Sequence, residues 1–449
     1  MDVATLVSQL GGFLYSFGTF VIVLSVIVFV HEYGHYIVGR WSGIHPEVFS
    51  LGFGPVLASR VDRRGTRWQI AAIPFGGFVK FLGDADAASG KDAAAIAAAE
   101  ADPAHLRRTM HGAPLWARSA TVAAGPVFNF ILSLVIFAGL TLSEGRVQEP
   151  LTVGELKAMP QSYDLRPGDV ILGIEGQDTP KFSDPEAWGA FRANIPVKDS
   201  LDYRVERNGR VETVSGPYLS PTYISGVDPR SAADEAGLKI GDVITAVDGT
   251  PIFTFDALKE RVETANGAEL NLSVWNAGET RELILSPKRR DEPTADGGFQ
   301  TVWRIGVRGE MPFDPATVAI SPVEAVEFGA LQVWRMITTQ ISGLKHIITG
   351  QISTCNLSGP VAIAETAGTA ASQGATNLIW LIAALSTGIG LVNLFPVPVL
   401  DGGHLVFFAY EAVTRRAPNE RAMQVLMSIG LALILGLMLF SIGNDTLFC

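Results

Sequence analysis

The sequence has almost no cysteine and little charge. Cys355 and Cys449 are the only cysteines among 449 residues, so the chain has neither the spacing of a cysteine-ligated metal site nor a disulfide framework. Charged residues make up 18% of the chain, and the formal net charge is −11. A nucleic acid partner is therefore not expected, because phosphate binding requires a basic surface.

The N-terminal segment also lacks the features of a cleaved signal peptide. Asp2 is the only charged residue before a long apolar run, so no basic region precedes that run. The run ends in "HEYGH", where a cleavage site would carry small residues. We therefore expect the first apolar run to be a membrane helix and not a leader sequence.

Long apolar runs, by contrast, are frequent. Hydrophobic residues make up 48% of the chain and the mean hydropathy is +0.28, as is typical of a membrane protein. Four runs reach the length of about 20 helical residues that crosses a bilayer; they cover approximately 13–38, 119–142, 377–399 and 422–443. Pro396 and Pro398 lie at the end of the third run and predict an unwound or kinked segment there.

The charges between these runs predict an orientation. Residues 40–118 contain ten Lys or Arg and seven Asp or Glu, whereas residues 144–310 contain 19 and 28. Because basic segments stay in the cytoplasm, we expect 40–118 and 400–421 to be cytoplasmic. The region 144–365 and both termini would then lie outside.

The outer region contains an internal repeat. "LRPGDVILGIEGQDTPKFSDPEAW" at 165–188 resembles "LKIGDVITAVDGTPIFTFDALKE" at 238–260, with the same order of turn, strand, turn and helix. We expect two copies of one α+β domain, at 144–219 and 220–312. In the following linker at 313–365, apolar residues at helical spacing predict an amphipathic helix over 321–350 at the outer membrane surface. Residues 84–104 have low complexity and are expected to form a loop.

The end of the first apolar run carries a pattern for metal chemistry. In "HEYGH", His31 and His35 are one helical turn apart and can bind a single Zn²⁺, while Glu32 can take a proton from water. The alternative is a pair of structural histidines packed against hydroxyl or carbonyl groups. We favour the metal site, because ionisable residues inside a membrane are costly and are mostly functional.

A catalytic zinc needs a third protein ligand and one open position. Asp401 is the first charged residue after the third apolar run, on the same predicted side as His31 and His35. The two prolines before it break the helix and allow its carboxylate to turn inward. His404 is an alternative third ligand, and an interfacial aspartate that only ends a span is the structural alternative.

These segments together resemble the site-2 intramembrane metalloproteases, peptidase family M50, and among them the bacterial type that regulates the sigma-E envelope stress response. The resemblance rests on HEYGH, "NLFPVPVLDGGH" at 393–404, "AGPVFNF" at 124–130, "FSLGFGP" at 49–55, "PFGGFVK" at 74–80, "NLSGP" at 356–360 and two PDZ-like repeats. It implies a polytopic α-helical membrane protein with about four transmembrane helices, a membrane-associated β-hairpin and two periplasmic PDZ-like α+β domains. Its parts would be an N-terminal membrane part at 1–143, the two PDZ-like domains at 144–219 and 220–312, the linker with its amphipathic helix at 313–365, and a C-terminal membrane part at 366–449.

The resemblance also implies functional residues. It matches His31, His35 and Asp401 to zinc ligands, Glu32 to the general base, and Asn393 to a residue that holds the substrate backbone, which an amide can do as donor and acceptor. Gly76, Gly77, Phe78 and Val79 match a hairpin whose edge strand pairs with an unwound substrate; a purely structural hairpin is the alternative. Gly125 and Asn129 match a motif that packs near the site, for which a plain helix contact is equally compatible.

The implied function is zinc-dependent cleavage of membrane-spanning segments in the bacterial inner membrane. The implied substrate is an anti-sigma factor already cut by another protease, or a remnant signal peptide. The PDZ-like pair would exclude bulky ectodomains, or it would bind a newly exposed C-terminus. We favour the size filter, because only Ile224, Ser225 and Gly226 offer part of a carboxylate-binding loop.

Two other classes of function remain as alternatives. A membrane-bound PDZ scaffold with a vestigial HExxH predicts no zinc. A tethered protease that works outside the membrane is disfavoured, because HEYGH lies on the predicted cytoplasmic side, away from the outer region.

Overall fold

The computed structural model describes residues 3–85, 92, 102–294, 298–353 and 359–448 and divides the chain into two compact units. The first unit comprises the chain up to Leu140, Val323–Lys345 and the chain from residue 354 onwards. The second comprises Thr141–Pro322 and His346–Ser353. Of the loop predicted at 84–104, only 84, 85, 92 and 102–104 are described, and residues 356–358 of "NLSGP" lie outside the described part.

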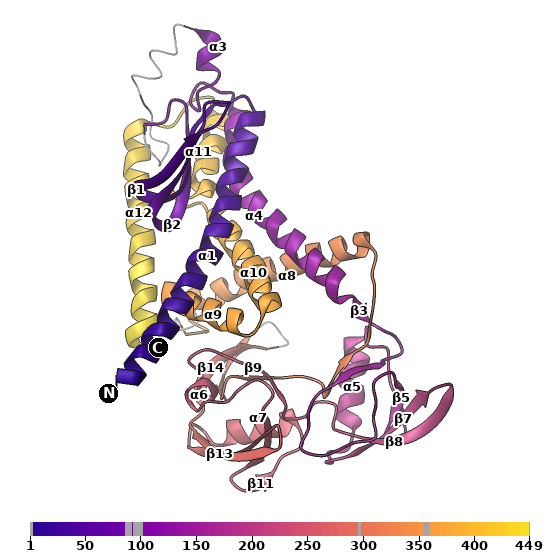
Figure 1. Ribbon diagram of the computed structural model, residues 1–449. Helices are drawn as coiled ribbons and strands as arrows, with labels where there is room; N and C mark the ends of the chain where they lie inside the picture. Colours follow the sequence, from indigo (N-terminus) through magenta and orange to yellow (C-terminus); the bar gives the residue numbers. More distant parts are fainter. Residues whose placement is uncertain (1–2, 86–91, 93–101, 295–297, 354–358, 449) are drawn as a thin grey trace. The chain divides into compact units, whose positions relative to one another are not determined.

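The first unit is built mainly from long helices (Figure 1). Its helices are α1 (Val3–Trp41), α3 (Pro103–Leu106), α4 (Leu115–Glu144), α8 (Pro322–Ile348), α9 (Pro360–Ser372), α10 (Ala375–Asn393), α11 (Asp401–Thr414) and α12 (Glu420–Gly443), followed by a π-helical turn at Asn444–Phe448. Four stretches are long and apolar enough to cross a membrane, namely Gly11–Trp41, Leu115–Glu144, Ala375–Asn393 and Arg421–Thr446. The four predicted spans are therefore confirmed as apolar helices, and the chain is a multi-pass membrane protein.

The third of these helices ends earlier than predicted. Residue 399 was the expected end, but α10 stops at Asn393, and α11 begins only at Asp401. Pro396 and Pro398 lie between the two helices, where neither can donate a helical hydrogen bond. The unwound segment that the prolines predict is thus residues 394–400.

One helix lies within the region predicted as a linker, 313–365, and a second begins there and extends beyond it. α8 coincides to within two residues with the predicted amphipathic helix 321–350, and its Val333 packs against Phe137 and Ala383. Its position at a membrane surface stays a prediction. The second helix, α9, was not predicted, and its Gly368 lies against Ser16 of α1, where a larger side chain would overlap.

The predicted hairpin consists of β1 (Pro46–Val61) and β2 (Arg67–Phe81), and both strands fold back on themselves. Phe49 of β1 pairs with Val79 on one side and with Trp68 on the other. Residues 58–61 of β1 continue the sheet beyond residues 67–70 of β2. Residues 77–80 therefore form one edge of a small four-segment sheet, and Figure 1 shows both strands beside α1.

Large apolar side chains of this sheet are exposed. They are Phe53, Val56, Leu57, Val61, Ile70, Ile73 and Phe75, each 39–70% exposed. Phe75 also contacts Phe17 and Phe20 of α1, which lie within the first apolar span. An apolar sheet surface of this kind suits a lipid environment.

The second unit contains two sheets with the same strand order. In the first repeat the order is β6 (Gln177–Asp178), β5 (Val170–Ile174), β7 (Leu201–Arg207), β8 (Arg210–Gly216), with helix α5 (Pro185–Asn194). In the second repeat it is β11 (Thr250–Pro251), β10 (Val243–Val247), β12 (Leu270–Asn276), β13 (Glu279–Leu285), with helices α6 (Ala232–Glu235) and α7 (Phe255–Thr264). The internal repeat in the sequence thus corresponds to a repeated topology.

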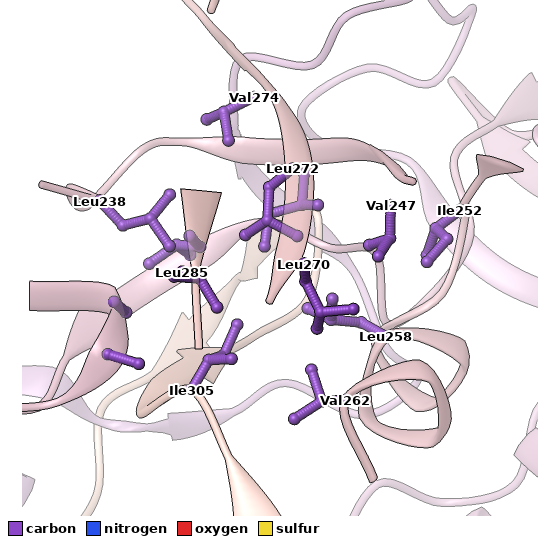
Figure 2. Close-up of a cluster of buried hydrophobic side chains, with 14 of the residues drawn as sticks. Leu238, Val247, Ile252, Leu258, Val262, Leu270, Leu272, Val274, Leu285 and Ile305 are labelled. Carbon is purple, nitrogen blue, oxygen red and sulfur yellow. The ribbon is translucent and has the colours of Figure 1, made fainter. Parts of the chain in front are cut away.

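Each repeat has its own hydrophobic core. In the second repeat, Leu272 of β12 is completely buried and Leu258 of α7 is 1% exposed; Figure 2 shows both in one cluster with Val247 and Ile305. In the first repeat, Tyr203 and Ile171 are completely buried. Alternation of buried and exposed side chains along β7 and β12 produces these cores.

Shorter strands complete the unit and correct one predicted boundary. The strands are β3 (Arg146–Val147), β4 (Val153–Leu156), β9 (Ile224–Val227), β14 (Lys288–Pro293), β15 (Phe299–Arg304), β16 (Val307–Gly309), β17 (Phe313–Pro315) and β18 (Thr317–Val318). β17 pairs with β4 and β18 pairs with β3, and Phe313 is buried in the first repeat's core. The linker therefore does not begin at residue 313, because residues 313–318 return to the first repeat.

Candidate metal centre

α1 places two imidazoles and a carboxylate at the edge of a cavity. No charged residue lies between Leu10 and Val30, so the apolar helix continues without interruption to His31. His31 and His35 are one turn apart, and their Nε2 atoms are separated by 3.2 Å. Both side chains are largely buried, at 11% and 12% exposed.

The third group comes from the other end of the sequence. Asp401 is the first residue of α11, and its Oδ2 lies 3.1 Å from His31 Nε2. Its Oδ1 lies 3.5 Å from His35 Nε2. The next two residues, Gly402 and Gly403, allow this approach, because a Cβ atom on either would overlap the carbonyls of residues 394, 395 or 397.

These donor atoms fit a metal cation. The ligand atoms of His31, His35 and Asp401 lie within 4.8 Å of one another. His35 Nδ1 is 2.9 Å from the Thr121 carbonyl, to which it donates, so the neutral ring keeps an unprotonated Nε2 on the inner side. Two imidazole nitrogens and a carboxylate that converge in this way can hold a cation between them, and this donor set is typical of catalytic zinc.

Three residues of α4 lie against the two imidazole rings. Thr121 contacts His35, and the amide of Asn129 lies 3.2 Å from His31 Nδ1. Gly125 stands between them, and a Cβ atom there would lie 2.7 Å from His31 Nε2 and even closer to His35. Partners of this kind on the outer nitrogens fix ring orientation in metal sites. Asn129 and Gly125 therefore do more than pack two helices together.

A cavity of about 440 Å³ adjoins this cluster. Its lining contains the predicted ligands, base and substrate-binding residues, namely His31, Glu32, His35, Gly76, Gly77, Phe78, Val79, Asn393 and Asp401. Glu32 lies against the sheet edge, since a Cβ atom on Gly77 would be 3.0 Å from the Cγ atom of Glu32. Glu32, the sheet edge and the amide of Asn393 thus share one space with the three converging donor groups.

His404, the alternative third ligand, lines the same cavity but is not among the three residues with converging donor atoms. Sequence reasoning missed several lining residues, which are Val28, Phe53, Phe81, Ile389, Val399 and Met427. It also missed Thr121, although this residue is four positions before Gly125 and so lies on the same face of α4. That spacing is the signal that could have identified Thr121.

The second unit has a groove of its own. A hollow of about 310 Å³ in the second repeat is lined by Phe255, Leu258 and Val262 of α7 and by Val307, Arg308 and Gly309 of β16. The predicted loop at 224–226 does not line this groove. It belongs to β9, which pairs with β16.

Known proteins resemble this chain over almost its full length. The profile of peptidase family M50 matches residues 19–437. The chain is 33% identical to the metalloprotease MmpA of Caulobacter vibrioides, over 97% of this chain and 96% of that protein. A protein of Agrobacterium fabrum, named "Putative zinc metalloprotease", is 36% identical over 95% of this chain and 94% of its own length.

Proposed function

The chain belongs to peptidase family M50 and is a zinc metalloprotease, and from this premise we propose that it cleaves peptide bonds within the membrane-spanning segments of other proteins. The observation that carries the proposal is the position of the ligand cluster. His31 and His35 lie inside the apolar span Gly11–Trp41, and Asp401 meets them from the end of an unwound segment next to α10. A scaffold with a vestigial HExxH does not account for this arrangement.

We assign the zinc ligands to His31, His35 and Asp401 and the proton transfer to Glu32. When bound, zinc supplies the Lewis acidity that makes water and a peptide carbonyl reactive at neutral pH. Glu32 lines the cavity beside the ligands, where it takes the proton of the attacking water and delivers it to the leaving amine.

The substrate would bind along the edge of the sheet. A helical segment hides its peptide bonds in hydrogen bonds, so it must unwind before cleavage. Residues 77–79 belong to the sheet edge and line the cavity, and such an edge can pair with an extended strand. Asn393, on the opposite helix, can donate to and accept from the same strand.

The proposal is tested with Glu32→Gln in the full-length protein. The variant is expected to retain one zinc per chain and the fold, but to lose at least about 100-fold of its cleavage rate, as is typical for the loss of a general base. Cleavage of a single-span reporter in vesicles and elemental analysis of zinc measure both quantities. Full activity in the variant contradicts the mechanism, and a wild-type protein without zinc contradicts the metal centre.

We further propose the bacterial inner membrane as the location, with 40–118 and 400–421 in the cytoplasm and the second unit in the periplasm. The charge asymmetry of these segments supports the orientation. The substrate class that we propose is a single-span anti-sigma factor already trimmed outside, in the envelope stress response. Quantitative membrane proteomics of the Glu32→Gln strain tests it, and an unchanged level of every single-span protein contradicts it.

For the two repeats, at 144–219 and 220–312, we propose a PDZ-like fold and a role as a size filter that excludes bulky ectodomains. The groove in the second repeat supports a second role, the binding of an extended C-terminus. β16 pairs with β9 and lines the groove together with Lys259 of α7. If the groove binds a carboxylate, Lys259→Glu weakens binding of a C-terminal peptide to the full protein; unchanged binding contradicts this role.

A further inference from the structure

α4 carries a polar stripe that extends beyond the metal centre. Thr121, Gly125 and Asn129 are spaced by four residues and face the two imidazoles. Arg118 precedes Thr121 by three residues and so lies on the same face of the helix. The stripe that supports His31 and His35 therefore continues to a guanidinium group.

Arg118 holds α11 through a two-pronged ion pair. Its Nη2 and Nη1 donate to the two carboxylate oxygens of Glu411, at 2.6 and 3.1 Å. Its Nε donates to the Ala113 carbonyl, and its guanidinium carbon lies 5.3 Å above the ring of Phe408. Both charged side chains are largely buried, at 14% and 22% exposed. These four contacts fix the orientation of the Arg118 guanidinium. The ion pair therefore depends on geometry as well as on charge.

α11 carries Asp401 at its other end. Asp401, Phe408 and Glu411 are separated by seven and three residues, which places them on one face of α11. Ten residues of helix span about 15 Å, so the ion pair acts on Asp401 only through the rigid helix. Glu411 at one end of this face contacts α4 directly through Arg118. Asp401 at the other end contacts His31 and His35, which in turn contact α4.

The segment before Asp401 is held by close packing and not by a side-chain cap. α11 has no side-chain N-cap at Leu400. Val399 has a φ of +100°, which is an outlier for a β-branched residue and must be held by its surroundings. Glu411 therefore adds, further along the helix, a side-chain anchor that the start of α11 lacks.

We propose that Arg118 and Glu411 are positioning residues for the metal centre. Their ion pair sets the place of α11 along α4 and thereby holds the Asp401 carboxylate opposite His31 and His35. α4 then positions all three ligands, because it contacts both histidines and holds the helix that carries Asp401. This inference rests on the proposed function, because it assigns the zinc to these three residues.

The test measures zinc affinity and not only activity. The purified full-length protein is titrated with zinc against a competing chelator, first as wild type. Arg118→Gln and Glu411→Gln are each expected to weaken zinc binding about 10- to 100-fold, the usual effect of losing an outer partner of a metal site. Arg118→Lys keeps the charge but not the two-pronged geometry, so it is expected to weaken zinc binding as well.

A matched control comes from the second unit. Arg304 makes a similar two-pronged pair with Glu292, at 2.7 and 2.6 Å. Arg304→Gln is expected to leave the zinc dissociation constant unchanged, whatever it does to thermal stability. The visible absorption of the cobalt-loaded protein gives a second readout, since it is expected to change in the Arg118 and Glu411 variants and not in the control.

The outcomes separate positioning from simple stabilisation. A lower melting temperature with a zinc dissociation constant within twofold of wild type in Arg118→Gln and Glu411→Gln overturns the proposal. If neither variant folds, an unchanged dissociation constant in Arg118→Lys overturns it. A wild-type protein that binds no zinc rejects the metal centre itself, which is a failure of the proposed function and is visible before any variant is made.

Discussion

At the residue scale, the candidate centre combines few ligands with close contacts around them. His31 and His35 provide nitrogen atoms, and Asp401 provides both of its oxygens to the same space. Thr121 and Asn129 occupy the outer sides of the rings, and Gly125 leaves room for the inner sides. Each of these residues suggests a change whose effect is confined to the metal site.

Asp401→Ala removes one of three converging ligands and is expected to abolish stable zinc binding. Zinc content after dialysis, measured by elemental analysis, is the readout. His404→Ala is the matched control, because His404 lines the cavity without joining the ligand cluster. Zinc lost from His404→Ala and kept by Asp401→Ala would reverse the assignment of the third ligand.

Gly125→Ala introduces a Cβ atom that overlaps both imidazoles, so the rings or α4 must move. We expect zinc affinity to fall at least about tenfold, the scale of an outer-partner loss. Gly139→Ala on the same helix is the control, since nothing lies within 4 Å of its Cβ position. Equal zinc affinities of the two variants in a chelator competition would show that α4 does not press on the rings.

At the element scale, two irregular features build the cavity. The helix pair α10 and α11 is interrupted by residues 394–400, and this interruption brings Asp401 to the imidazoles. The sheet folds back on itself, which leaves residues 77–80 as an edge beside Glu32. An uninterrupted helix would not bring the Asp401 carboxylate to the cavity. A simple two-stranded hairpin would not place this sheet edge beside it.

The sheet edge gives a prediction about substrate contact. A photo-reactive phenylalanine analogue in place of Phe78, combined with Glu32→Gln to stop turnover, is expected to cross-link a bound single-span substrate. The same analogue at Leu57, an exposed residue beside the opposite edge, serves as the control. Cross-links of equal yield at both positions, measured by immunoblot, would argue against strand pairing at residues 77–80.

At the scale of the whole molecule, the chain combines two units with separate cores. The first holds the cavity with the predicted ligands, base and substrate-binding residues. The second begins and ends in paired strands, since β3 pairs with β18 and the Gln148 N–H donates to the Ala316 carbonyl at 2.8 Å. This closure allows most of the second unit to be excised at one point.

Replacement of residues 149–315 by a short Gly-Ser linker is expected to leave zinc binding intact, because the ligand cluster lies wholly in the first unit. If the repeats act as a filter, the shortened protein will cleave reporters with intact ectodomains that the full-length protein rejects. Reporters with trimmed ectodomains are the control for activity. Zinc retained with continued rejection of intact reporters would count against a filter.

The sequence alone was sufficient for features that depend on local pattern. Apolar runs set the four spans, the spacing in HEYGH placed His31 and His35 on one helical face, and the repeat at 165–188 and 238–260 matched two sheets of equal strand order. Resemblance to a known family added Asn393 and residues 76–79, and these line the same cavity.

Only the tertiary structure decided what depends on contacts between distant segments. It gave the distances at which the predicted ligand Asp401 approaches residues some 370 positions earlier, folded the hairpin into a wider sheet and returned residues 313–318 to the first repeat. It also paired Arg118 with Glu411. Hydropathy and spacing report on neighbours along the chain, whereas these contacts depend on how helices and strands pack in three dimensions.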